Sequence, residues 1–250
     1  MKRIVSLVLC FVFIISLSSC KEPLTVPGTE KIIAVKYASA NELACEEYIS
    51  DGYTKVTYNS SSDVVLAVEN KKVNCGILDE FELNSYIDAG RNIKQLEDCE
   101  YNIDYCAYFS SENEALQNSF NKAIEELKND GSLDKIINAH MKGERFQYSE
   151  SNNENGTLTM LCDPNFDNRA YTDTNGEIVG LDVDIARAIC NYLGYDLEIE
   201  TVDFDELFIK LDSGEGDFII SSCEVNEERE EYYLASDTYF TLYFYLIGRK

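Results

Sequence analysis

The residues best placed to do chemistry lie in one stretch, residues 217–229, which reads DFIISSCEVNEER. An apolar run of three residues, short enough for a buried strand, precedes the hydroxyls of Ser221 and Ser222. Asn226 is a candidate cap for a new helix that contains Arg229. Backbone N–H groups at a helix start favour an anion, and an arginine binds a carboxylate through two parallel hydrogen bonds. The stretch therefore predicts an anion site. The alternative is a solvated arginine that pairs with the glutamates around it.

The start of the chain has the composition of a secretory signal. Residues 1–19 combine a basic start, Lys2 and Arg3, with an apolar segment too short to span a bilayer. The ending Leu-Ser-Ser-Cys resembles the lipobox of bacterial lipoproteins, which implies cleavage before Cys20 and lipidation of that residue. An ordinary signal peptide with a chance cysteine is the alternative. Residues 20–30 hold two of the prolines and are predicted to be a tether.

The net charge and the cysteine content limit which classes of partner and cofactor are expected. The sequence has 21 Lys and Arg against 46 Asp and Glu, a net charge of −25, which argues against nucleic acid and anionic lipid as direct partners. Membrane contact is expected through the lipid anchor alone. The cysteines beyond Cys20 are odd in number and form no CxxC pair, so neither a metal site nor a cofactor is predicted. A single disulfide, with Cys99 and Cys106 as one candidate pair, is left open.

Strand patterns alternate with helix patterns along the whole chain, which predicts an α/β fold with mostly parallel sheets flanked by helices. A first block, residues 31–143, ends in two helices, Glu112–Asn129 and Ser132–Met141. Residues 144–156 are polar and of low complexity, and are predicted to be a linker. A second alternating block, residues 157–250, follows it.

The second block contains a series of short segments whose order and spacing are informative. They are Asp163–Phe166, Tyr171–Gly176, Ile178–Ala186, Leu193–Tyr195, Phe204–Leu207, Leu211–Gly214, Asp217–Ser222, Glu228–Arg229 and Ser236–Tyr239. In this order they resemble the first lobe of the bacterial extracellular solute-binding proteins, family 3, which serve amino-acid ABC importers. Through its first strand, the loop Ala38–Asn41, the strand ending at Asp79 and the helices around 121–136, the first block resembles the second part of that family. The resemblance implies the two-lobed, type 2 periplasmic-binding-protein fold.

The order of the two blocks departs from the family, in which the block seen here at 157–250 comes first. The resemblance therefore implies a circularly permuted chain, with residues 144–156 joining the usual ends. Lobe B would be residues 31–109, the closing helices 110–143 would pack on lobe A, and lobe A would be 157–250. One covalent crossing between lobes would remain, with both termini near the hinge. A linker of this length spans roughly 20 Å, which favours a monomer over a dimer with exchanged halves.

The resemblance also implies which residues would bind the carboxylate and the ammonium group of an amino acid. Arg229 would clamp the carboxylate of an amino acid, and Ser221 and Ser222 would supply backbone or hydroxyl contacts. Asp79, at a strand end, would accept the ammonium group. A cap for the helix that follows is the alternative role of Asp79.

Further residues would complete or disturb this site. Ser39 and Asn41 would donate from lobe B, with Ser39 as a helix cap in the alternative, and Phe204 would line the side-chain pocket unless it is plain core. Glu224 stands where the family often has a hydroxyl residue, so it would repel an anion or pair with the arginine clamp. Arg169 replaces an aromatic residue and would contact a polar or acidic side chain, or supply the positive charge that Glu224 cancels.

These inferences predict a lipid-anchored solute-binding protein at the outer face of the bacterial cytoplasmic membrane. It would capture a small zwitterion, an amino acid above all, and deliver it to an ABC permease, without being an enzyme. A degenerate surface lipoprotein that keeps the fold as a sensory or protein-interaction module is the alternative. An enzyme such as a dehydratase is disfavoured, because the sequence offers no candidate catalytic base besides the residues predicted to bind the ligand. The single histidine, His140, is predicted to be solvated.

Overall fold

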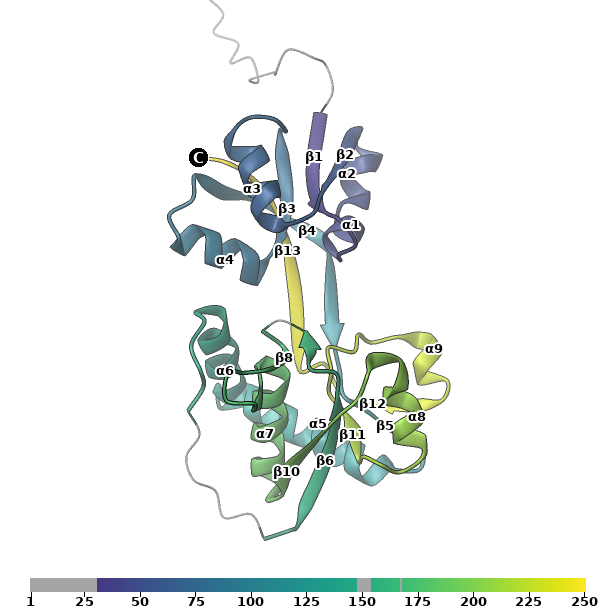
Figure 1. Ribbon diagram of the computed structural model, residues 1–250. Helices are drawn as coiled ribbons and strands as arrows, with labels where there is room; N and C mark the ends of the chain where they lie inside the picture. Colours follow the sequence, from purple (N-terminus) through teal and green to yellow (C-terminus); the bar gives the residue numbers. More distant parts are fainter. Residues whose placement is uncertain (1–30, 148–153, 167) are drawn as a thin grey trace, which may run out of the picture. The chain divides into compact units, whose positions relative to one another are not determined.

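The computed structural model describes residues 31–147, 154–166 and 168–250, and residues 31–250 form one unit. Two five-stranded sheets dominate the described residues (Figure 1). The first sheet has the order β2-β1-β3-β13-β4. Its strands are β1 (Lys31–Lys36), β2 (Tyr53–Tyr58), β3 (Cys75–Asp79), β4 (Ile93–Tyr105) and β13 (Phe240–Arg249).

Short helices flank the first sheet: α1 (Asn41–Ala44), α2 (Glu46–Ser50), α3 (Ser61–Glu69) and α4 (Glu80–Asp88). Helix α3 lies very close to β3, because a Cβ added at Gly76 would stand 2.7 Å from Cγ1 of Val64. Its cap is Ser60, whose side chain accepts the backbone N–H of Asp63. A glycine in the strand thus permits tight helix-on-sheet packing.

The second sheet has the order β10-β6-β11-β5-β12. Its strands are β5 (Tyr108–Ser110), β6 (Thr157–Cys162), β10 (Asp196–Thr201), β11 (Phe218–Ile219) and β12 (Tyr233–Ala235). The helices of this half are α5 (Glu114–Asn129), α6 (Ser132–Met141), α7 (Leu181–Leu193), η1 (Phe204–Glu206), α8 (Leu207–Asp212) and α9 (Glu227–Glu230). A small antiparallel sheet joins β7 (Asn165–Phe166), β8 (Ala170–Thr172) and β9 (Ile178–Val179).

Each large sheet contains one strand from the other block of the sequence. Strand β13, the end of the second block, pairs with β3 and β4, and β5 from the first block pairs with β11 and β12. The chain therefore passes between the sheets twice in the described residues, at β4–β5 and at β12–β13, and the expectation of one crossing was wrong. The apolar residues of β13 favour a central position, and six of its ten residues are buried.

The two ends of the described unit lie at one end of the first sheet. Strand β1 runs parallel to β3, and β13 runs antiparallel to it on its other side. Lys31 and Lys250 therefore flank the start of β3, as Figure 1 shows for β1 and the C-terminus. The bridge between Tyr105 and Glu224 lies at the opposite end of β4, so the expectation that the termini lie near the hinge was also wrong.

An aromatic cluster fixes α5 on the second sheet. The ring of Phe120 on α5 lies 4.9 Å from Phe109 on β5 and 4.8 Å from Phe218 on β11. All three side chains are fully buried. This packing confirms the amphipathic pattern of α5 in the sequence. Within the described ranges, no helix combines the length and the apolarity needed to cross a membrane.

Candidate functional site

Arg229 lies on α9, and the side chain of Asn226 caps that helix by accepting the Arg229 backbone N–H at 3.1 Å. The guanidinium carbon stands 5.3–5.9 Å from the centres of three rings, Tyr108, Phe204 and Phe208. Nη1 reaches the carbonyl oxygen of Glu224 at 3.5 Å. No ion pair among the described residues includes Arg229, so the expected alternative of an arginine paired with surrounding glutamates is not the arrangement found.

The two serines of the predicted anion site make hydrogen bonds within the protein. Ser221, fully buried, accepts the backbone N–H of Asp163 at 2.9 Å. Ser222 donates both its backbone N–H and its hydroxyl to Oδ2 of Asp182, at 2.6 and 2.8 Å, and has a φ of +49°. Asp182 also accepts the hydroxyl of Tyr239 at 3.0 Å. These bonds shape the loop that leads to α9, and the hydroxyl hydrogen of Ser222 is already used.

Asp182 is fully buried. The N-cap of α7 is Gly180, and Asp182 stands in the first turn with its carboxylate directed to Ser222 and Tyr239. Burial raises the pKa of the Asp182 carboxyl group, while the nearby charge of Arg169 and its hydrogen bonds act in the opposite direction. The hydrogen bonds from Ser222 and Tyr239 are needed here, because burying a carboxylate without partners is energetically unfavourable.

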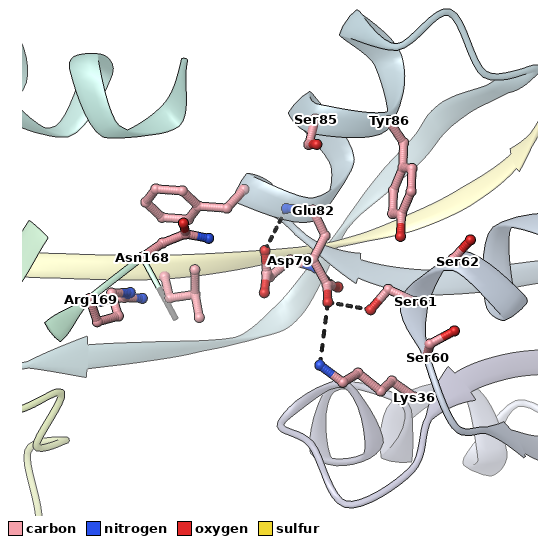
Figure 2. A pocket seen from close by; sticks show the side chains of 12 residues that line it. Lys36, Ser60, Ser61, Ser62, Asp79, Glu82, Ser85, Tyr86, Asn168 and Arg169 are labelled. Carbon is pink, nitrogen blue, oxygen red and sulfur yellow. Dashed lines mark hydrogen bonds and ion pairs between the residues drawn. The ribbon is translucent and has the colours of Figure 1, made fainter. Parts of the chain in front are cut away.

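A cavity of about 410 Å³ lies at the end of β3 (Figure 2). Its lining residues are Lys36, Ser60, Ser61, Ser62, Asp79, Phe81, Glu82, Ser85, Tyr86, Asn168, Arg169 and Leu242. Two of the sequence-predicted site residues, Asp79 and Arg169, share this cavity, and the others do not line it. The wall of hydroxyls was missed in the sequence, where the serine run before α3 was interpreted only as a source of helix caps.

Asp79 is both a helix cap and a part of the cavity wall. Its Oδ1 accepts the backbone N–H of Glu82 at 2.8 Å, and Glu82 in turn accepts the N–H of Asp79 at 3.4 Å, which is a capping box. Burial raises the pKa of the Asp79 carboxyl group, and the negative charge of Glu82 raises it further, while Arg169 lowers it. The alternative cap role is thus present together with exposure to the cavity.

Glu82 is held by a network that includes Asn41. Its carboxylate accepts from the hydroxyl of Ser61 and from the amide of Asn41, the latter at 3.3 Å, and lies 3.9 Å from Nζ of Lys36. Asn41, only 3% exposed, also donates to the carbonyl of Ile77 at 3.2 Å. Ser39 donates to the carbonyl of Lys36 at 2.9 Å. Asn41 and Ser39 therefore support the first sheet and its network from outside the cavity.

Arg169 extends into the interior of the protein. The residue is 9% exposed, and its guanidinium carbon stands 4.5 Å from the ring centre of Phe240, 4.6 Å from Tyr105 and 5.5 Å from Phe81. Its Nη1 is buried and has no hydrogen-bond partner. The charge is stabilised by ring faces rather than by a direct ion pair in the described part of the chain.

Glu224 and Phe204 border the Arg229 side of the molecule. Glu224 is exposed, forms an isolated antiparallel bridge with Tyr105, and accepts the hydroxyl of Tyr108 through its carbonyl at 2.9 Å. Its contact with Arg229 is made by the same carbonyl. The Phe204 ring packs edge-on to Phe166, at 5.8 Å between ring centres, so it combines packing with contact to the guanidinium. Cys20, the expected lipidation site, lies outside the described residues.

The structure answers the open question of a disulfide and contradicts the expectation for His140. The cysteines in the described residues are all free, six of them buried, so Cys99 and Cys106 do not form the candidate disulfide. His140 is not solvated: its Nε2 stands 2.7 Å from Oδ2 of Asp184, and its side chain is 11% exposed, because α6 packs on α7. Among the described residues, no group of three or more His, Cys, Asp or Glu side chains could hold a metal ion.

Comparison with known proteins relates the last part of this chain to a known family. The sequence profile of the bacterial extracellular solute-binding proteins, family 3, matches residues 158–250. The arginine-binding extracellular protein ArtP of Bacillus subtilis is 29% identical over 103 residues, which cover 41% of this chain and 40% of ArtP. A membrane-bound lytic murein transglycosylase F of Desulfosudis oleivorans is 34% identical over 98 residues, which cover 39% of this chain and 21% of that protein.

A solved structure gives a match to an isolated domain. The arginine-bound form of domain 1 from TmArgBP is 32% identical and is covered to 81% of its length by 38% of this chain, with a TM-score of 0.33. Residues 158–250 are thus identified as a region of the bacterial extracellular solute-binding proteins, family 3. The chain's sheets flanked by helices are the α/β architecture expected from the resemblance. The chain spans less than half the length of the curated relatives named here.

Proposed function

We propose that this protein binds a small amino acid between its two large sheets, with Arg229 holding the carboxylate and Asp79 the ammonium group. The observation that carries the proposal is the state of Arg229. Five glutamates stand within five residues of it in the sequence, yet its guanidinium rests on aromatic rings and forms no ion pair in the described residues. A half-buried cation held in this way keeps its hydrogen-bond donors for an external carboxylate.

A series of contacts connects Arg229 with the cavity that Asp79 lines. Arg229 touches the carbonyl of Glu224, and Glu224 bridges to Tyr105. The Tyr105 ring stacks on Arg169, which lines the same cavity as Asp79. Arg229 on α9 belongs to the half of the second sheet, and Asp79 ends β3 in the first sheet. A ligand that contacts both would favour closure of the two halves. Ser221, Ser222, Ser39 and Asn41 would act by shaping the two walls.

The setting of this activity is proposed from the sequence and the relatives. Three curated relatives carry the name arginine-binding, and the family description is extracellular. We infer a lipid anchor at Cys20, a position at the outer face of the cytoplasmic membrane, and delivery of the ligand to an ABC permease by a monomer. The protein would bind without catalysis. The matched part of the lytic transglycosylases would then be a binding domain within a longer enzyme.

Isothermal titration calorimetry of the purified chain against the twenty amino acids tests the proposal. We expect at least one saturable ligand, and a tighter complex in the Glu224→Ser variant, because the exchange removes a negative charge near Arg229. Glu227→Ser is the matched control. It changes an exposed glutamate at the start of α9, the helix that contains Arg229, and should leave the affinity unchanged. If neither the wild type nor Glu224→Ser binds any amino acid, the proposal fails, and the alternative of a protein-interaction module that binds no amino acid takes its place.

A further inference from the structure

The cavity at the end of β3 contains a cation that lacks a direct anionic partner among the described residues. Arg169 is 9% exposed, and its Nη1 is buried without a hydrogen-bond acceptor. It is the one buried side-chain nitrogen or oxygen of the described residues found in that state. A buried N–H group without an acceptor is unfavourable, and more so when it carries charge. Arg169 therefore lines the cavity with a guanidinium for which no hydrogen bond is found among the described residues.

The position of this guanidinium is fixed by an aromatic cage. Tyr105 ends β4, Phe240 begins β13, and Phe81 lies on α4, so the cage is built from the two strands that lead to the second sheet and from a helix of the first. Ring faces attract a cation but offer no carbonyl or carboxylate oxygen to its N–H groups. The cage thus holds Arg169 in place and leaves the hydrogen-bonding capacity of Nη1 unfilled.

The backbone of Arg169 is held as firmly as its side chain. Its N–H donates to the carbonyl of Phe166 at 3.1 Å, and its carbonyl accepts the N–H of Asp182 at 3.0 Å. Gly180 lies against it so closely that a Cβ there would stand 2.2 Å from the Arg169 carbonyl oxygen. The arginine is therefore positioned by the start of α7 and by the small sheet.

The other charged groups of the cavity already have partners. Lys36 is close to Glu82, which also accepts from Ser61 and Asn41. Figure 2 shows Arg169 and Asn168 on one side of Asp79, and Lys36 with Ser60, Ser61 and Ser62 on the other. A volume of about 410 Å³ is of the size that small-molecule sites have.

We propose that Arg169 selects the side chain of the bound amino acid, and that its guanidinium donates to a carboxylate or amide oxygen at the end of that side chain. The ligand is then an acidic or amide amino acid. A cationic side chain, such as that of the arginine named for several relatives, would place a second positive charge beside Arg169. This inference rests on the proposed function, which supplies the sites for the α-carboxylate and α-ammonium groups.

The test is calorimetric titration with glutamate, glutamine, alanine and arginine. The wild type should bind glutamate or glutamine about 10-fold or more tightly than alanine or arginine, because a charge-assisted hydrogen bond is gained. In Arg169→Met, which keeps an unbranched stem for the aromatic cage, the preference over alanine should disappear. Arg91→Met is the control, since Arg91 pairs with Glu69 and does not line the cavity. A preference for glutamate indicates a carboxylate ligand, and a preference for glutamine an amide.

The outcomes separate this inference from the proposed function. If amino acids bind and the preference for glutamate or glutamine survives in Arg169→Met, Arg169 is structural and only the inference fails. If Arg169→Met does not fold, the affinities of the wild type for the four amino acids decide. The inference is overturned if the wild type binds arginine or alanine as tightly as it binds both glutamate and glutamine. If no amino acid binds to the wild type, the proposed function fails and the inference fails with it.

Discussion

Single carboxylates in this protein have environments that their sequence neighbours do not reveal. Asp79 caps α4 and also lines the cavity, and Asp182 is fully buried beneath Ser222 and Tyr239. The family resemblance identified Asp79 as a candidate, and both of its alternative roles are compatible with the geometry. The environment of Asp182 depends on Ser222 and Tyr239, forty and fifty-seven residues away, so no local pattern could have indicated it.

Glu80, the first residue of α4, gives a pH-dependent prediction. Burial, followed by the charge of Asp79, raises the pKa of Glu80 from 4.5 to about 7. Between these values the unfolded chain releases the proton while the folded protein keeps it, so the free energy of unfolding falls as pH rises through this window. Glu80→Gln removes the effect. We expect the variant to gain about 1–3 kcal/mol relative to the wild type between pH 4 and pH 8.

Urea denaturation at a series of pH values measures this difference. Glu114→Gln changes the exposed first residue of α5 and should follow the wild-type curve at every pH. A Glu80→Gln curve parallel to that of the wild type from pH 4 to pH 8 would show that Glu80 ionises normally in the folded protein.

At the scale of elements, the link between β9 and α7 determines where Arg169 lies. Gly180 caps α7 with a φ of +135°, and its α-carbon packs on the Arg169 backbone. The sequence predicted the hairpin of β8 and β9 correctly, because the turn residues Asn175 and Gly176 are a strong local signal. It did not predict the contact between Gly180 and Arg169, because that contact depends on how the small sheet meets α7.

Gly180→Ala should therefore be costly. The new methyl group would overlap the Arg169 carbonyl, and alanine is strained at this φ, so we expect a loss of about 2–4 kcal/mol in the free energy of unfolding. Gly90→Ala is the matched control, because Gly90 has a φ of +72° with open space around it and should cost about 1 kcal/mol. Equal losses in the two variants, measured by urea denaturation, would exclude the proposed steric contact.

At the scale of the whole described unit, the two large sheets share one strand order. When the strands of the small sheet are left out, the second, first and third strands of one block are followed in each by a strand from the other block and then by a fourth strand. Alternating helices and strands revealed the α/β class in the sequence. The exchange of β5 and β13 was not predicted, because borrowing a strand depends on long-range pairing that no short apolar run specifies.

This exchange gives a test of the proposed circular permutation. Lys31 and Lys250 flank β3 at one end of the first sheet, so their strands are two sheet spacings, about 10 Å, apart. A rearranged chain would run from Thr157 to Lys250, cross a linker of about four residues, and continue from Lys31 to Gln147. We expect it to fold cooperatively, with a free energy of unfolding within about 2 kcal/mol of the original order. Failure of cooperative unfolding in circular dichroism would count against the permutation.

The central claim, an amino acid held between Arg229 and Asp79, is tested most directly by titrating the tightest ligand of the wild type into Arg229→Ala. Removing the carboxylate clamp should weaken binding by about 100-fold or more, since a charge-assisted bidentate contact is lost. Asp79→Asn should weaken binding as well while it preserves the cap of α4, because asparagine caps helices as well as aspartate does. An affinity in Arg229→Ala equal to that of the wild type would contradict the account.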